Sequence, residues 1–157
     1  MQTLIYVDCE TTGLDPEKGH ILELGMLAVS LPDFTPIGTF SEVLRPEMWG
    51  TVQRNMHPTV QTMHSVSGLS DAIERISGTQ NTVQEHAVMF VQEFTKGNKS
   101  PIAGANPGFD RKWLVRHMPK LEARFHYSHF DVRTITYLQQ WVLGEPFVES
   151  SHRALAD

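Results

Sequence analysis

Tyr6-Val7-Asp8-Cys9-Glu10-Thr11-Thr12-Gly13-Leu14 opens with the end of an apolar run, Leu4 to Val7, which predicts a buried strand that ends in two acids. Because side chains two residues apart on a strand point to one face, Asp8 and Glu10 project together from its end. Neighbouring anions repel each other, and a bound hard cation relieves that repulsion. The segment therefore predicts a cation site or, as the simpler alternative, two acids that solvate a turn at Gly13.

The composition is that of a globular chain. Its 157 residues are enough for one domain with a sizeable core, and its hydrophobic share of 40% excludes a disordered tail. No apolar run approaches the roughly 20 residues that cross a bilayer, so no membrane contact is expected. The single cysteine, Cys9, excludes an internal disulfide and suits a reducing compartment, which predicts a cytoplasmic protein. We expect Cys9 to be a small core residue.

The charge balance narrows the classes of ligand. With 13 basic and 18 acidic residues, the formal net charge is −5, which argues against a broad phosphate-binding face. It leaves open an enzyme that grips one strand end through bound metals. A cluster of basic residues follows position 110, and it forms either a local basic face or a solvated helix surface. Its members are Arg111, Lys112, Arg116, Lys120 and Arg124.

Three strands open the chain. A turn signal at residues 15–19 separates the first strand from a β-rich stretch, His20 to Leu31, and Thr35 to Leu44 completes an antiparallel meander. Glu23, inside the second strand, is predicted to be a partnered structural acid.

The pattern loosens between residues 45 and 69, where prolines and glycines separate short helical pieces. Trp49, His57 and His64 are expected in exposed loops, where they either touch a ligand or close the edge of the core. Ser70 is predicted to cap a short helix over residues 71–76.

The second half of the chain alternates helices and strands. Asp110 is predicted in the first turn of a helix that follows a buried strand, where the helix N-terminus favours a carboxylate. The other elements expected here are a helix that Asn81 caps and that ends near Lys96, a helix over 134–143, and strands over 101–104 and 126–132. The sequence therefore predicts one α/β domain over residues 1–157. Its sheet is mixed, an antiparallel meander followed by parallel strands, and helices flank it.

The last residues add a histidine and a further acid. Asp157 lies five residues after His152, and five helical residues turn through about 500°, so the two side chains do not share a helix face. A histidine beside a metal-bound acid can deprotonate water. Asp8, Glu10, Asp110 and Asp157 supply enough carboxylates for two divalent ions about 3.5–4 Å apart.

Three motifs, in this order, resemble the histidine-bearing branch of the DEDD 3′→5′ exonucleases, which have a ribonuclease-H-like fold. They are Asp8-Cys9-Glu10-Thr11-Thr12-Gly13-Leu14, Gly104-Ala105-Asn106-Pro107-Gly108-Phe109-Asp110 and His152-Arg153-Ala154-Leu155-Ala156-Asp157. Within that branch the similarity to the oligoribonucleases covers nearly the whole chain. That family degrades the last few nucleotides of RNA.

The resemblance implies a two-metal exoribonuclease that hydrolyses short single-stranded RNA to 5′-mononucleotides. Two Mg²⁺ or Mn²⁺ ions would be held by Asp8, Glu10, Asp110 and Asp157, with His152 as the general base. Leu14 would wedge against a base, and Tyr127 would reach into the partner's site in a homodimer. The substrate contacts implied are Thr11, Gly13, Leu14, His64, Asn106 and Tyr127.

The chain departs from the family pattern at three places. Thr59 stands where oligoribonucleases usually have a stacking tryptophan, and Ser128 replaces the basic residue that usually follows Tyr127. The family also continues for one more helix beyond the last aspartate, so we expect the sequence to lack its C-terminal helix.

Two other functions are compatible with the same residues. The first is a DNA 3′→5′ exonuclease of the same branch, of proofreading or repair type, with identical chemistry and a different groove. The second is a non-catalytic module that keeps the fold and binds nucleic acid. The four acids argue against the second function, because a pure binder gains nothing from acids that face a phosphate chain.

Overall fold

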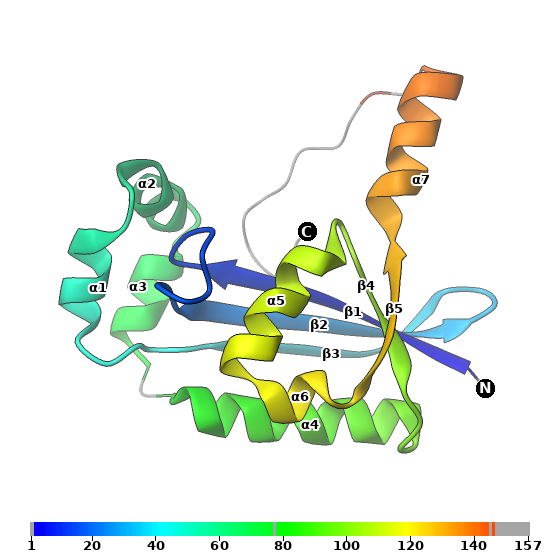
Figure 1. Ribbon diagram of the computed structural model, residues 1–157, viewed down its shortest axis with the longest axis horizontal. Helices are drawn as coiled ribbons and strands as arrows, with labels where there is room; N and C mark the ends of the chain where they lie inside the picture. Colours follow the sequence, from blue (N-terminus) through cyan, green and yellow to red (C-terminus); the bar gives the residue numbers. More distant parts are fainter. Residues whose placement is uncertain (1, 77, 145, 147–157) are drawn as a thin grey trace.

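A computed structural model describes residues 2–76, 78–144 and 146 (Figure 1). His152 and Asp157 lie outside the described residues. In chain order the described elements are β1 (Gln2–Thr11), β2 (Ile21–Leu31), β3 (Thr35–Val43), α1 (Trp49–Asn55), α2 (Pro58–Val66), α3 (Leu69–Glu74), α4 (Gln80–Thr95), β4 (Ser100–Gly104), α5 (Pro107–His117), α6 (Pro119–Glu122), β5 (Phe125–Asp131), α7 (Val132–Leu138) and the π-helix η1 (Gln139–Leu143).

The strands form one mixed sheet in the order β3-β2-β1-β4-β5. β1, β2 and β3 pair antiparallel, whereas β4 pairs parallel with β1 and β5 pairs parallel with β4. This arrangement confirms the predicted meander followed by parallel strands. It also makes β1 the central strand. Open α/β sheets bind ligands at the carboxyl ends of their strands, and β1 ends in the two acids.

Strand β1 is longer than its apolar run, because its pairing with β2 continues through the acids. The antiparallel register sets Glu10 opposite Glu23. Glu23 is only 1% exposed and accepts a hydrogen bond from Ser41 Oγ at 3.1 Å. The prediction that Glu23 is a partnered structural acid is confirmed.

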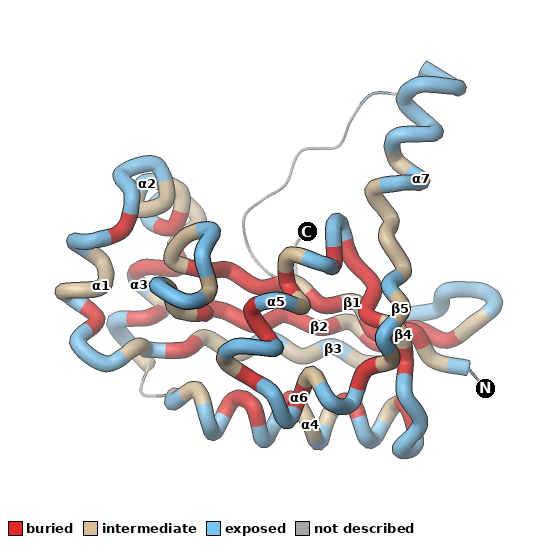
Figure 2. The backbone as a smooth tube through the Cα atoms, in the orientation of Figure 1, coloured by how far each residue is buried: buried red, intermediate tan, exposed pale blue. Residues whose placement is uncertain are grey.

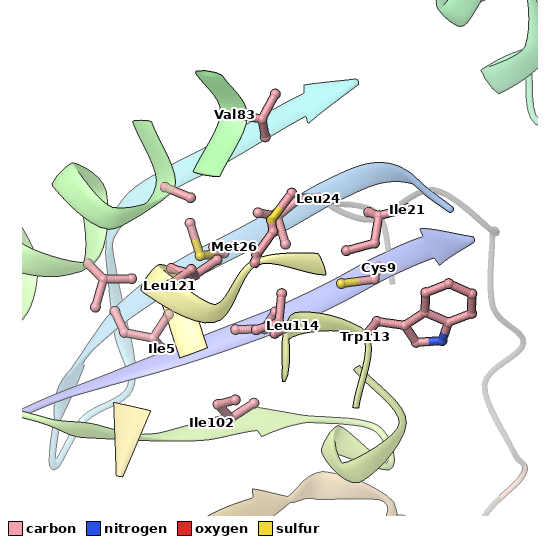
Figure 3. Packing of buried hydrophobic residues seen from close by; sticks show 14 of the residues in the cluster. Ile5, Cys9, Ile21, Leu24, Met26, Val83, Ile102, Trp113, Leu114 and Leu121 are labelled. Atoms are coloured by element: carbon pink, nitrogen blue, oxygen red, sulfur yellow. The ribbon is translucent and has the colours of Figure 1, made fainter. Parts of the chain in front are cut away.

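The main core lies between the sheet and the helices α4, α5 and α6 (Figure 3). Ile5 and Leu24 from the central strands pack there with Leu114 of α5. Figure 2 shows the same pattern along the tube, where the buried stretches follow β1 and β2. Cys9 belongs to this core, as predicted, and Trp113 lies beside it at the end of β1.

A second, smaller core lies where α1 and α3 pack on the start of β2. Its members are Leu22, Trp49, Met56, Leu69 and Ile73. The prediction that Trp49 and His64 lie in exposed loops was wrong, because both residues are helical and buried, at 3% and 0% exposure. His57 is exposed, as predicted. Ser70 is buried inside α3, which begins after Gly68, so the predicted cap at Ser70 was also wrong.

The last described helices extend away from the sheet (Figure 1). Asp131 caps α7 by accepting the Arg133 N–H, so the helix begins two residues before the predicted start at Thr134. Within the described ranges, no helix has both the length and the apolar character needed to cross a bilayer.

Candidate active site

The acids of β1 come after the residues of β1 that pair with β4. The described pairing of β1 with β4 ends at Tyr6 and Ala103, and the chain then turns into α5. The first turn of α5 therefore takes the place of a neighbouring strand beside Asp8 and Glu10.

Asp110 joins α5 to this open edge. Its Oδ1 accepts the Cys9 N–H at 2.9 Å, across 101 residues of sequence. The bond satisfies a β1 amide and fixes the Asp110 carboxyl between the positions of Asp8 and Glu10 on the strand. The structure thus brings Asp110 to the end of β1 that carries Asp8 and Glu10, and a shared ion held by the three carboxyls stays a prediction.

The electrostatics of Asp110 fit a cation site. The side chain is 4% exposed, and burial together with the nearby Asp8 charge raises the pKa of Asp110 from 3.8 to about 7. The hydrogen bond from Cys9 opposes the shift without cancelling it. Since a desolvated carboxyl facing a second carboxylate is costly, a hard divalent cation between them would stabilise both.

Glu10 faces a buried histidine. His64 Nε2 lies 2.8 Å from the Thr11 carbonyl oxygen, and because a carbonyl only accepts, Nε2 carries the hydrogen. His64 Nδ1 is then turned towards Glu10, 3.8 Å from Oε2. His64 therefore holds the end of β1 through its contacts with Thr11 and Glu10. A direct contact between His64 and substrate stays a prediction.

Residues 12–20, here called the Leu14 loop, join β1 to β2. The ends of the loop are tied together, because the Thr12 N–H donates to the His20 carbonyl at 3.0 Å and the His20 N–H donates to Thr12 Oγ1 at 2.9 Å. Leu14 is 79% exposed. An exposed leucine on a closed loop beside the acids is suited to pack against a base.

Gly13 does not need its special backbone freedom. The sequence predicts that Gly13 turns the chain, but its φ angle is not positive and an added Cβ would meet nothing within 4 Å. Thr11 Oγ1 donates to the Gly13 carbonyl at 2.8 Å, which holds the turn instead. The open space beside Gly13 leaves room for a ligand, and contacts of Thr11 and Gly13 with substrate stay predictions.

Asn106 lies on the rim of the site. It is exposed, with a left-handed backbone (φ 64°), and its N–H donates to Asp131 Oδ1 at 3.1 Å. Asp131 thus fixes the turn before α5 as well as the start of α7. Sequence reasoning missed Asp131, although an aspartate between a strand and a helix is a typical N-cap signal.

The other predicted residues are not brought to the acids in the described part of the chain. Tyr127 lies on the edge strand β5 and is 80% exposed. Asp157 and His152 fall outside the described ranges. Within those ranges, no three histidine, cysteine or acidic side chains are close enough to hold an ion. The full predicted ligand set therefore stays a prediction.

A groove of about 440 Å³ adjoins the site. The Leu14 loop forms one wall, and α1 with the start of α2 forms the other, where Met48, Met56 and His57 face the groove. Its mixed apolar and polar lining is suited to a nucleotide-sized ligand.

Comparison with known proteins shows similarity to exonucleases. The RNase_T family model, described as an exonuclease, matches residues 5–157. An oligoribonuclease of Vibrio cholerae serotype O1 is 35% identical over 99% of this chain and 87% of its own length. An oligoribonuclease of Coxiella burnetii is 32% identical over 98% of this chain and 85% of its own length.

Solved structures share the fold at low identity. An apo exonuclease I superposes with a TM-score of 0.72 at 14% identity, over all of this chain and 39% of that chain. E. coli exonuclease I in complex with a dA13 oligonucleotide gives a TM-score of 0.69 at 14% identity, over 98% of this chain and 33% of that chain. This chain thus spans about a third of the exonuclease I chains that it matches. The likeness shows the fold.

Proposed function

Because the chain belongs to the RNase_T family of exonucleases, and within it to the oligoribonucleases, we propose that it hydrolyses short RNA from the 3′ end and releases 5′-mononucleotides. One observation carries the proposal. Asp110, buried on α5, is bonded to the β1 backbone between two further carboxylates. The sequence separation of 101 residues makes that meeting a product of the fold.

The donor set fits Mg²⁺ or Mn²⁺. We propose that Asp8, Glu10 and Asp110, with Asp157, hold two such ions through hard carboxylate oxygens. When bound, the ions neutralise charge on the phosphate and lower the pKa of water. The raised pKa of Asp110 supports this, because a desolvated carboxyl is the group that gains most from a cation.

The remaining steps belong to this chain's side chains. His152 is proposed to take the proton from the attacking water, Leu14 to pack against a base, and Asn106 to contact the substrate from the rim. His64 acts from beneath, where it keeps Glu10 and the Thr11 carbonyl in place.

The experiment that tests the function compares matched labelled RNA and DNA of two, five and twenty nucleotides, with Mg²⁺ and with a chelator. The proposal expects 5′-mononucleotides from RNA of two to five nucleotides and no products without the metal. Preference for DNA of any length would replace the proposal with the DNA exonuclease. Binding without turnover would favour the non-catalytic module.

Thr59→Trp is expected to increase the affinity for the shortest RNA. Thr59 lies in the first turn of α2, next to His57, which faces the groove. A stacked base contributes about 1–3 kcal/mol, so a tryptophan there should lower KM for two-nucleotide RNA by about tenfold. RNA of five or more nucleotides, which is held at further points, should gain less. An equal gain at every length would contradict this placement of the base.

We also propose that the protein is a cytoplasmic homodimer. The support is a set of exposed apolar side chains on the last described helices and β5. Its members are Tyr127, Ile135, Leu138, Trp141, Val142 and Leu143, between 48% and 80% exposed. Surfaces of this kind mark interaction sites. The buried Cys9, with no disulfide partner in the chain, suits a reducing compartment.

If Tyr127 acts in the partner's site, two inactive variants should restore activity when they are mixed. Tyr127→Ala lacks only the donated residue, and Asp110→Asn lacks only a residue of its own site. In a mixed dimer one of the two sites has both residues, so about a quarter of all sites should become active. Sedimentation and turnover before and after subunit exchange measure this. Absence of recovery in proven mixed dimers would place Tyr127 outside the partner's site.

A further inference from the structure

Helix α5 carries more than Asp110, because its second half contacts the Leu14 loop. Lys112 Nζ donates to the Leu14 carbonyl oxygen at 2.9 Å. His117 Nε2 lies 2.8 Å from the Pro16 carbonyl oxygen, to which it can only donate. The two donors follow Asp110 by two and seven positions. A single helix therefore carries one proposed metal ligand and two ties to the loop that carries Leu14.

Both donors are oriented by aromatic neighbours on α5 itself. Lys112 Nζ lies 4.5 Å from the centre of the Phe109 ring, a cation–π geometry. The His117 ring stacks on Trp113 with 5.4 Å between ring centres and 18° between planes. Partial burial lowers the pKa of His117, so the neutral ring donates through Nε2 near pH 7. Neighbours on the same helix therefore hold both donors towards the loop.

The loop also packs closely on α5 near its end. A Cβ added at Gly19 would lie 2.7 Å from Trp113 Cη2 and 2.7 Å from Thr12 Oγ1, so the backbone of Gly19 fits directly between them. An ion pair between Arg116 and Glu17, at 3.0 Å, adds little because both side chains are mostly exposed. The hydrogen bonds that hold Leu14 and Pro16 of the loop against α5 are those of Lys112 and His117.

These ties contribute little to holding the helix on the sheet. α5 is already fixed by Trp113 and Leu114, both fully buried, and by Asp110. Lys112 is exposed, so its loss leaves no cavity and no buried polar group. Removal of the donor is expected to release the Leu14 carbonyl, and Leu14 lines one wall of the groove.

We propose that Lys112 and His117 are positioning residues that hold the Leu14 loop in register with Asp110 and so set the binding of the terminal nucleotide. This inference rests on the proposed function, because it assumes that Leu14 and the groove receive part of the RNA. Through α5, the site for the scissile phosphate and the wall that receives a base become parts of one rigid unit.

The test uses the full chain with Lys112→Met and His117→Phe, each of which keeps the apolar part of the side chain and removes the donor. His117→Phe also keeps the stacking on Trp113. Lys112→Arg restores a donor and is the conservative rescue. Lys99→Met, an exposed lysine just before β4, is the matched control. Each protein is measured with two-nucleotide RNA, with bis(p-nitrophenyl) phosphate and by amide exchange of residues 12–20.

Loss of either tie should raise KM for two-nucleotide RNA about five- to tenfold, the effect of one charge-assisted hydrogen bond at Lys112 or one partly buried hydrogen bond at His117, with kcat changed less than about twofold. Amides of the Leu14 loop should exchange faster, whereas those of β1 and α5 should not. Lys112→Arg should recover most of the KM, and Lys99→Met should match the wild type.

Two results would overturn the proposal. One is unchanged KM together with unchanged exchange in the loop. The other is an equal loss of kcat on RNA and on bis(p-nitrophenyl) phosphate, which indicates damage to the acids instead of the groove. If the wild type cleaves neither substrate, the proposed function fails. The exchange rates then still decide whether Lys112 and His117 hold the loop.

Discussion

Asp110→Asn is expected to abolish hydrolysis of short RNA and, at the same time, to stabilise the metal-free protein at pH 8. Asparagine keeps an oxygen that can accept the Cys9 N–H, so the link between α5 and β1 survives. The change removes a charge that we propose binds metal and that, without metal, is buried next to Asp8. Loss of a metal ligand removes several kcal/mol of barrier lowering, which takes turnover below detection.

The stability effect follows from the pKa of Asp110. An acid whose pKa rises from 3.8 to about 7 on folding binds more protons in the folded state, so the stability of the metal-free protein falls as pH rises from about 4 to about 7. Above pH 7 the full penalty remains, on the order of 4 kcal/mol, and Asp110→Asn removes it. The melting temperature in a chelator should therefore be higher for the variant at pH 8 and similar at pH 4.

Added Mg²⁺ should reverse the order, because it stabilises the wild type and not the variant. Glu85→Gln, an exposed acid on α4, is the control and should change neither property. If Asp110→Asn keeps half of the wild-type activity in Mg²⁺, the assignment of the site is wrong.

His152→Asn should lower kcat by about 10²–10⁴-fold and leave metal and RNA binding intact. A general base must be deprotonated to act, so the wild-type rate should rise from acidic towards neutral pH, and that rise should disappear in the variant. Single-turnover rates across pH 5–9 measure both effects. His86→Asn, an exposed histidine on α4 that pairs with Glu42, should keep the wild-type profile. An unchanged profile in His152→Asn would remove that residue from the mechanism.

The sheet and its acids could be predicted because their signals are local. An apolar run that ends in Asp8 and Glu10 indicates a central strand with two carboxylates on one face. Asp110 follows a buried strand and begins a helix, and parallel strands bring such positions to one edge of the sheet. Each of these inferences uses fewer than ten consecutive residues, and the structure bonds Asp110 to the Cys9 amide between the two acids of β1.

What the sequence could not reveal depends on packing between distant segments. Nothing near His64 distinguishes a buried histidine from an exposed one, since its burial comes from α2 closing over the end of β1. The ties from Lys112 and His117 join residues 98 and 101 positions apart. The sequence shows the cluster of basic residues after Asp110. Only the fold shows that Lys112 of this cluster contacts the Leu14 loop.

The rate at which a thiol reagent labels Cys9 reports how often the active-site strand opens. It is the single cysteine of the chain, and its thiol is buried in the main core while its amide is bonded to Asp110. Burial, with help from the nearby carboxylates, raises the pKa of the Cys9 thiol well above its usual value, so a thiol reagent reacts only after β1 and α5 separate. Labelling rates in native buffer therefore measure the free energy of that opening. Any metal or RNA that binds only the closed site should slow the labelling by a factor of 1 + L/Kd, where L is its free concentration.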